Sequence, residues 1–177
     1  MTGRPYTIVL FGAGKAEESS SLFQLAEQLG RLLAETGYTI ANGGYGGTML
    51  ASARGAASVG GSVIGVTCRA FGRSGPNPYI TQEISTADLS ERLAKLIELG
   101  QAYLVLPGGT GTLLELADVW ERKNKGFANT DKPIILIGEF WKTLADSIAE
   151  IDPRAGRCIH IAADPQQVLN ILSETLI

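Results

Sequence analysis

The sequence predicts an α/β fold: a single-domain, Rossmann-like, doubly wound and mainly parallel sheet with helices on both faces. Short apolar segments alternate with longer segments of helical periodicity along the chain. The apolar segments are continuous, as in strands that helices cover on both sides. Glycine-rich turns follow three of these segments, as expected where parallel strands end at a ligand-binding edge.

The strands are predicted from continuous apolar runs bounded by glycine, proline or polar residues. A doubly wound sheet buries both faces of such strands, which explains why they contain few polar residues. We expect strands at Tyr6–Gly12, Tyr38–Ala41, Ser62–Thr67, Tyr79–Ile84, Ala102–Val105, Pro133–Ile137 and Cys158–Ala162.

The helices are predicted from apolar residues that recur every three or four positions, with serine or aspartate at several starts. The segment after the first strand, for example, repeats leucine and alanine at this spacing and ends at Gly37. We expect helices at Ser19–Thr36, Thr48–Val59, Asp88–Leu99, about Thr112–Lys123, Trp141–Ala149 and Pro165–Leu176.

Composition limits the function classes. With 177 residues, 45% of them hydrophobic, the chain can bury one core, so we expect one domain over residues 1–177. A net charge of −3 without runs of lysine or arginine argues against a nucleic-acid partner. No apolar stretch is long enough to span a bilayer, so we expect no membrane partner and a cytoplasmic protein. Cys68 and Cys158 have no metal or redox spacing and are expected to be buried free thiols.

The glycine-rich segment after the fifth strand has the features of an anion site. Glycines permit close backbone approach, while the free amides and the dipole of a helix N-terminus favour a phosphate. A glutamate follows about one turn later. Thr112 and Glu115 also fit a capping box, whose purpose can be helix stability alone. The segment reads Pro107-Gly108-Gly109-Thr110-Gly111-Thr112-Leu113-Leu114-Glu115.

The other two glycine turns fit no standard nucleotide motif. Gly12-Ala13-Gly14 lacks the third glycine of a dinucleotide fingerprint, and Asn42 stands where an acid would hold the ribose. A phosphate-binding Walker loop is also absent, because Ala16 follows Lys15. The second turn, with Gly43, Gly44 and Gly47, is richer in glycine than a turn requires, which fits ligand contact and close packing equally well.

Two features near the sheet edge leave alternatives open. Arg92 follows Asp88 by four residues, as in an exposed helical ion pair, but it also lies at the edge of the apolar stripe and could point along the sheet edge. The loop that contains Arg69 and Arg73 fits either a solvated loop or one that closes over a ligand.

Several motifs together resemble the Lonely Guy family of cytokinin-activating phosphoribohydrolases, which is often mislabelled as lysine decarboxylases. Residues 107–115 resemble the family signature PGGxGTxxE, and Gly43, Gly44, Gly47 and Met49 resemble its GGxxGxM motif. Arg92 stands fifteen residues before the signature, at the position of the family's active-site arginine. The resemblance covers roughly residues 6–140. No part of the chain resembles a pyridoxal-phosphate site.

The resemblance implies an enzyme that hydrolyses the N-glycosidic bond of a purine nucleoside 5′-monophosphate. The implied catalytic residues are Glu115 and Arg92, with no cofactor and no metal. Glu115, near a positive helix end, is expected to be ionised. A homodimer is also implied. The implied phosphate- and nucleotide-binding residues are Gly108, Gly109, Thr110, Gly111, Thr112, Gly43, Gly44 and Gly47.

The resemblance has departures that leave the substrate open. Residues 89–93 keep only the arginine of the family's Met-His-x-Arg-Lys motif. Proteins of the same fold include a molybdenum-cofactor carrier, so a non-catalytic carrier of a nucleotide or phosphorylated pterin is the alternative. An interaction module with purely structural loops is a third hypothesis.

Overall fold

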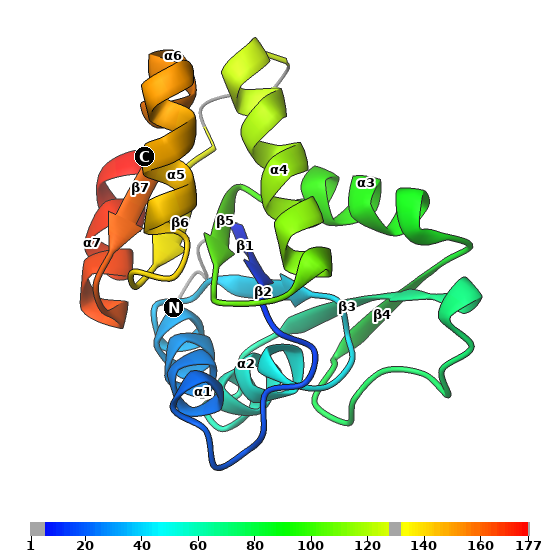
Figure 1. Cartoon of the computed structure of the whole chain (residues 1–177). Coiled ribbons are helices and arrows are strands. Elements are labelled where there is room, and N and C mark those ends of the chain that lie inside the picture. The colour runs from blue at the N-terminus through cyan, green and yellow to red at the C-terminus, as the bar shows by residue number, and fades with distance from the viewer. Residues whose placement is uncertain (1–5, 128–131, 177) are drawn as a thin grey trace.

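The computed structural model describes residues 6–127 and 132–176. This part of the chain contains one seven-stranded sheet in which every neighbouring pair is parallel, so the fold predicted from the sequence is confirmed (Figure 1). The strand order is β4-β3-β2-β1-β5-β6-β7. The strands are β1 (Thr7–Phe11), β2 (Thr39–Asn42), β3 (Val63–Cys68), β4 (Gln82–Thr86), β5 (Ala102–Val105), β6 (Ile134–Ile137) and β7 (Ile159–Ala162).

The helices connect the strands and begin largely where the sequence predicts. Side chains of Ser20, Asp88 and Asp164 accept a hydrogen bond from a first-turn amide and so cap three of them. Among the described residues, no helix is both long and apolar enough to cross a membrane. The helices are α1 (Ser21–Glu35), α2 (Thr48–Ala57), the short 3₁₀ helix η1 (Arg69–Phe71), α3 (Leu89–Leu99), α4 (Thr110–Lys125), α5 (Lys142–Ile151), α6 (Pro153–Gly156) and α7 (Pro165–Thr175).

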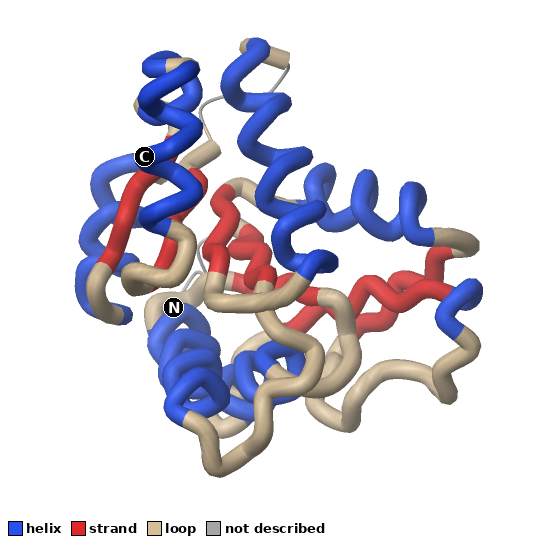
Figure 2. The backbone as a smooth tube through the Cα atoms, viewed as in Figure 1, coloured by secondary structure: helices blue, strands red, loops and turns tan. Residues whose placement is uncertain are grey.

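The helices form a layer on each face of the sheet, as the blue and red segments of Figure 2 show. Helices α1, α2 and α7 contribute to one hydrophobic core, and α3, α4, α5 and α6 to the other. Successive strand residues alternate between the cores: Ile8 and Leu10 lie in the first, and Val9 and Phe11 in the second. Both faces are therefore buried, which explains the continuous apolar runs. Cys68 and Cys158 are buried free thiols, as expected.

The strand order places the three glycine turns side by side. The chain winds outward from β1 to β4 and then returns to β5, which pairs with the other edge of β1. A crevice forms at such a reversal, beyond the carboxyl ends of the strands. The glycine turns follow β1, β2 and β5, which are consecutive in the sheet. The expectation that they share one edge is therefore confirmed.

Two differences from the predicted helices have local causes. Helix α4 begins at Thr110 rather than Thr112, because Gly109 is the N-cap and the glycine turn is shorter than expected. Helix α6 is absent from the prediction because its four residues are too few to show a period. Its start is fixed by Asp152, whose side chain accepts hydrogen bonds from two amides, and by Pro153 in the first turn.

Helices α1 and α2 approach closely through two glycines. A Cβ added at Gly30 would lie 2.0 Å from the carbonyl oxygen of Ser52, and one added at Gly55 would lie 2.0 Å from that of Glu27. Each helix therefore packs its backbone against the other where a side chain is missing. This contact fixes α2, whose N-terminus follows the second glycine turn.

Gly30→Ala should lower the free energy of unfolding by about 1–3 kcal/mol, because the added methyl group must separate two packed backbones. Urea denaturation measures the change. Gly111→Ala is the matched control: a Cβ there meets nothing within 4 Å, so its stability should be unchanged or slightly higher. Equal effects of the two substitutions would contradict the close-packing explanation.

Candidate active site

A cleft of about 470 Å³ lies where β1, β2 and β5 end. Its walls come from all three glycine turns, from α3, from the start of α4 and from the loop after β3. The volume is in the usual range for a small-molecule site. The cleft also contains both residues expected to be catalytic, Arg92 and Glu115, which are 23 positions apart in the sequence.

The N-terminus of α4 opens into this cleft. Its N-cap, Gly109, supplies no side-chain hydrogen bond to the first-turn amides, unlike the serine and aspartate caps of α1, α3 and α7. A Cβ at Gly109 or Gly111 would meet nothing within 4 Å, so packing does not require glycine at either position. A Cβ at Gly108, by contrast, would lie 2.2 Å from Thr112 Oγ1. Gly109 and Gly111 therefore leave free space in front of a helix N-terminus.

The capping-box interpretation of Thr112 and Glu115 is wrong. Thr112 lies inside α4 rather than at its N-cap, and Glu115 accepts a hydrogen bond from Arg92 Nη1 at 3.5 Å. The glutamate therefore faces α3 across the cleft.

Arg92 is held from two sides. Its Nε donates to the carbonyl oxygen of Val66 at 2.8 Å, and its Nη1 lies 3.5 Å from Glu115 Oε1. The side chains of Arg92 and Glu115 are only 8% and 14% exposed, so the pair is largely removed from water. Asp88 instead caps α3, so the alternative of an exposed pair between Asp88 and Arg92 does not hold. Of the two interpretations, the one that directs Arg92 along the sheet edge is confirmed.

Gly43 is required by this arrangement. A Cβ at Gly43 would lie 1.6 Å from Arg92 Nη2, so any side chain there would displace the guanidinium. Gly43 also lines the cleft.

Gly44 and Gly47 do not line the cleft, and packing alone accounts for both. Their φ values are +77° and +62°, a region that favours glycine. A Cβ at Gly47 would also lie 2.2 Å from the carbonyl oxygen of Ala13 in the first turn. Ligand contact by these two glycines stays a prediction.

The second turn is organised by residues that the sequence analysis did not place in the site. Asn42 is fully buried: its Nδ2 donates to the carbonyl oxygen of Met49, and its Oδ1 accepts from the amide of Gly44. Asn42 thus fixes the turn where a dinucleotide-binding protein would have an acid. The hydroxyl of Tyr45 donates to the carbonyl oxygen of Cys68 and accepts from its amide, which anchors the ring in the cleft wall. The position of Tyr45 between two pairs of glycines is the sequence signal that could have identified it as a residue of the cleft.

Burial raises the pKa of Glu115 to about 7, although the neighbouring Arg92 acts in the opposite direction. The expectation of an ionised carboxylate is therefore wrong at neutral pH, where both forms are populated. The helix end does not offset this effect of burial, because Glu115 is in the second turn of α4 and the charge of a helix end acts mainly within the first turn. A carboxyl group with a pKa near neutrality is suited to general acid–base chemistry.

An aromatic and cationic wall lies next to Arg92 in the cleft. The Tyr45 and Phe71 ring centroids are 6.1 Å apart, and Arg92 Cζ lies 5.9 Å from the first and 5.7 Å from the second. Arg73 Cζ lies 4.6 Å above the Tyr45 ring. Lys15, in the turn after β1, adds a third cation to the lining. Arg69 does not line the cleft, so the two arginines of this loop are in different environments.

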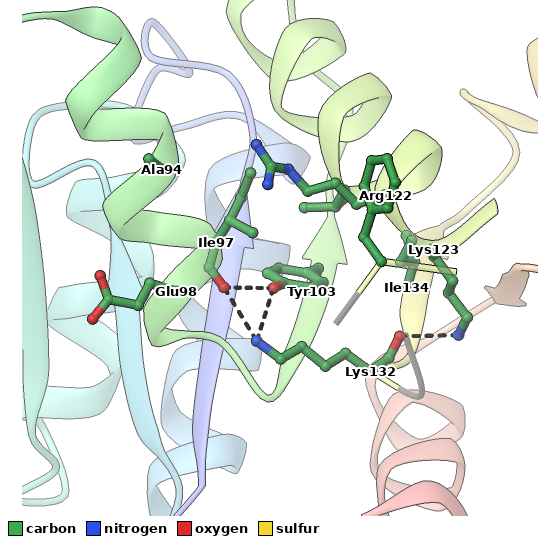
Figure 3. Close-up of a pocket in the computed structure, with 10 residues that line it drawn as sticks. Ala94, Ile97, Glu98, Tyr103, Arg122, Lys123, Lys132 and Ile134 are labelled. Atoms are coloured by element: carbon green, nitrogen blue, oxygen red, sulfur yellow. Dashed lines mark hydrogen bonds between the residues drawn. The ribbon is translucent and has the colours of Figure 1, made fainter. Parts of the chain in front are cut away.

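A second cavity, of about 220 Å³, lies between α3 and α4 near the start of β5 and β6 (Figure 3). Several of its polar groups form hydrogen bonds or ion pairs within the protein. The Tyr103 hydroxyl donates to the carbonyl oxygen of Ile97 at 2.7 Å, Lys132 Nζ lies 3.4 Å from the same hydroxyl, and Arg122 pairs with Asp118. This cavity is at the amino ends of the strands, opposite the edge where ligands usually bind. We therefore assign it to the internal packing of α3 and α4.

The raised pKa of Glu115 makes stability depend on pH. A carboxyl group whose pKa is higher in the folded state than its ordinary 4.5 stabilises the fold below about pH 4.5, and this contribution is lost as the pH rises through about 7. Glu115→Gln cannot ionise, so its melting temperature relative to that of the wild type should increase between pH 5 and pH 8. Glu121→Gln, which removes an exposed carboxyl group from the same helix, is the control. A Glu115→Gln difference that stays constant over this range would refute the assignment.

The comparisons with known proteins agree with the motifs. The family model described as "Possible lysine decarboxylase" matches residues 49–172. A cytokinin riboside 5′-monophosphate phosphoribohydrolase of Rhodococcoides fascians is 30% identical over 149 residues, 81% of this chain and 74% of the relative. The Mycobacterium tuberculosis protein of the same name is 31% identical over 135 residues, 75% of this chain and 70% of that protein.

Solved structures share the fold. The molybdenum cofactor binding protein of Rippkaea orientalis superposes with a TM-score of 0.82 over 98% of this chain and 99% of its own, at 21% identity. At that identity the likeness shows the fold alone. The family model and the two curated relatives cover most of the sequence, including the signature at residues 107–115. The chain therefore belongs to the Lonely Guy family, whose model carries the description of a possible lysine decarboxylase.

Proposed function

We propose that this protein hydrolyses the N-glycosidic bond of a purine nucleoside 5′-monophosphate, giving the free base and ribose 5-phosphate. The observation that carries the proposal is the buried Glu115–Arg92 pair, which lies in the same cleft as the uncapped N-terminus of α4. The names of the two relatives support this reaction class. The sequence expectations of one domain, a homodimer and a cytoplasmic location are retained as parts of the proposal.

The phosphate binds at the start of α4. The amides of residues 108–111 and the hydroxyls of Thr110 and Thr112 supply donors, and the helix dipole favours the negative charge. The space in front of Gly109 and Gly111 admits the phosphate without displacing a side chain. Lys15 is close enough to this end to add charge, because its turn is tied to the signature by the hydrogen bond from the Ala13 amide to the Pro107 carbonyl oxygen.

The ribose then lies beside Glu115. Glu115 is five positions after Thr110, which corresponds to roughly 7.5 Å along the helix axis and is comparable to the length of a ribose 5-phosphate. The carboxyl group consequently faces the sugar rather than the phosphate. Arg92 keeps the carboxyl group in place through the 3.5 Å contact and orients the substrate from the opposite side.

Glu115 acts on the attacking water. In its ionised form it accepts a proton from water as the water oxygen bonds to C1′ of the ribose. The electron pair of the C1′–N9 bond leaves with the purine, which takes up a proton from solvent. Glu115 then returns the proton it accepted to solvent, so protons balance over the reaction. The same carboxylate stabilises the positive charge that develops on the sugar. Among the described residues that line the cleft, Glu115 is the only carboxylic acid, so these roles fall to one group.

A non-catalytic carrier is the second candidate, and the likeness to the molybdenum cofactor binding protein favours it. A carrier would use the same turns to hold a phosphorylated ligand without breaking a bond. Incubating the purified protein with AMP, GMP and IMP and separating the products by chromatography distinguishes the two. Release of free base supports the hydrolase; tight binding without release supports the carrier.

Glu115→Gln should reduce base release by at least about 100-fold, because the amide cannot accept the proton of the attacking water. Nucleotide binding, measured by titration calorimetry, should remain within a few-fold of the wild type, since the phosphate site is unchanged. Glu121→Gln is the control and should retain the wild-type rate. If Glu115→Gln turned over normally, the assigned role would be refuted.

Gly109→Val should weaken nucleotide binding by about tenfold or more, because the new side chain occupies the space in front of the helix N-terminus. Calorimetry measures the loss, and circular dichroism checks the fold. Leu113→Val, which introduces the same side chain at an exposed position on the same helix outside the cleft, is the control. Wild-type affinity in Gly109→Val would contradict the phosphate position.

A further inference from the structure

The ion pair of the candidate site is open rather than closed. Arg92 Nη1 lies 3.5 Å from Glu115 Oε1, and no other hydrogen bond joins the two side chains. A guanidinium that closes on a carboxylate usually makes two parallel hydrogen bonds of about 2.7–2.9 Å. Because both side chains are largely buried, their attraction is screened less than it would be in water, which favours closure. Other contacts therefore restrain Arg92.

The contacts of Arg92 with the backbone do not hold the end of its side chain. The hydrogen bond to the carbonyl oxygen of Val66 is made by Nε, and it leaves both terminal nitrogens able to turn toward Glu115. The missing side chain at Gly43 leaves space for Nη2 but exerts no attraction on it. The restraint on the terminal nitrogens must come from another part of the cleft.

Two aromatic rings supply this restraint. Arg92 Cζ lies 5.9 Å from the ring centroid of Tyr45 and 5.7 Å from that of Phe71, within the range of about 6 Å at which a ring face attracts a cation. The two rings are inclined by 47° to each other, and the hydroxyl of Tyr45 is anchored to the backbone of Cys68. Both rings line the same cleft as the ion pair. They therefore compete with Glu115 for one guanidinium.

We propose that Tyr45 and Phe71 are positioning residues, whose rings hold the guanidinium of Arg92 back from Glu115 and keep the ion pair open. An open pair leaves the oxygen atoms of Glu115 free to accept a hydrogen bond from the attacking water, whereas a bidentate pair would engage both. The family motifs assign no role to either ring, because Tyr45 occupies an unspecified position of GGxxGxM and Phe71 lies outside the motifs. This inference rests on the proposed function for the identity of the reaction.

Loss of the Phe71 ring should make Glu115 more acidic. Arg92 would move closer to the carboxyl group, and water would reach that group more easily, since Phe71 belongs to the cleft wall. Both changes favour the carboxylate, so both lower the pKa of Glu115 from its present value of about 7. The other charged groups among the described cleft residues are Lys15 and Arg73, and Arg73 Cζ is 5.9 Å from the Phe71 ring. The effect of Arg73 therefore needs a separate variant.

Phe71→Leu tests the proposal, because Phe71 is 41% exposed and its replacement opens no buried core. The pH profile of kcat/KM for base release from AMP should shift its acidic limb down by about half a pH unit. The maximal rate should fall several-fold, since a more acidic carboxyl group is a weaker base. AMP titrates identically with both proteins, so a difference between the profiles belongs to the protein.

Two variants serve as controls for the loss of the ring. Phe71→Tyr retains an aromatic face and should keep the wild-type limb. Phe140→Leu removes an exposed phenylalanine outside the cleft and should keep both the limb and the rate. Tyr45 is left in place, because its replacement would also break the hydrogen bonds to Cys68.

Further variants identify Arg92 as the group through which the rings act. Trifluorophenylalanine at position 71 weakens the attraction of the ring for a cation with little change in shape, and it should lower the pKa of Glu115. The same replacement in Arg92→Met should have no effect. Arg73→Met removes a positive charge from the cleft and should raise this pKa. A lower pKa in Arg73→Met would refute the role of Arg92.

NMR of the labelled carboxyl carbon of Glu115, identified by its loss in Glu115→Gln, gives this pKa without turnover. An unchanged or raised pKa in Phe71→Leu refutes the positioning role and leaves the hydrolase standing. A slower Phe71→Leu with an unmoved limb shows a merely structural role for the ring and also refutes the inference. A lowered pKa that Phe71→Tyr restores, without base release by the wild type, supports the positioning of Arg92 and refutes the hydrolase.

Discussion

The contact between Arg92 and Glu115 is the constraint on which the candidate site depends. It joins α3 to α4 across the end of the sheet and is largely shielded from water. Arg92 is placed by the carbonyl oxygen of Val66 and by the missing side chain at Gly43. Four elements thus contribute to one ion pair: α3 supplies the arginine, β3 supplies an acceptor, the turn after β2 supplies space, and α4 supplies the acid.

The same contact explains the intermediate acidity of Glu115. Burial favours the neutral carboxyl group, while the guanidinium favours the carboxylate, and the balance places the pKa at about 7. A deeper site without Arg92 would keep the group protonated, and an open site would leave it fully ionised. Proton transfer in either direction is therefore accessible near neutral pH.

The sequence predicts the sheet and most helices because their signals are local or periodic. It also predicts the proximity of Arg92 and Glu115 through the resemblance to the Lonely Guy family. It does not predict the protonation of Glu115, which depends on the packing of α3 against α4. The sequence does not identify Tyr45 as a residue of the cleft wall, because it stands within a glycine-rich turn. Its ring is anchored only when the fold brings the Cys68 backbone, at the end of β3, to its hydroxyl.

The three glycine turns also differ in what glycine is needed for, which no sequence pattern reveals. Gly47 has a positive φ and backbone neighbours that exclude a side chain, whereas Gly109 has an ordinary φ of −92° and open space before it. Two residues of the same type in similar motifs therefore serve opposite purposes. One permits a tight turn, and the other leaves the front of a helix accessible.

The exclusion of a side chain at position 43 by the guanidinium of Arg92 has an evolutionary consequence. A Cβ at position 43 would lie 1.6 Å from Arg92 Nη2 and 2.6 Å from Met49 Sδ. A lineage that shortened residue 92 would therefore still have to move or shorten Met49 before a side chain fitted at position 43. Positions 43, 49 and 92 thus constrain one another, and a residue acquired at position 43 would in turn exclude an arginine at position 92.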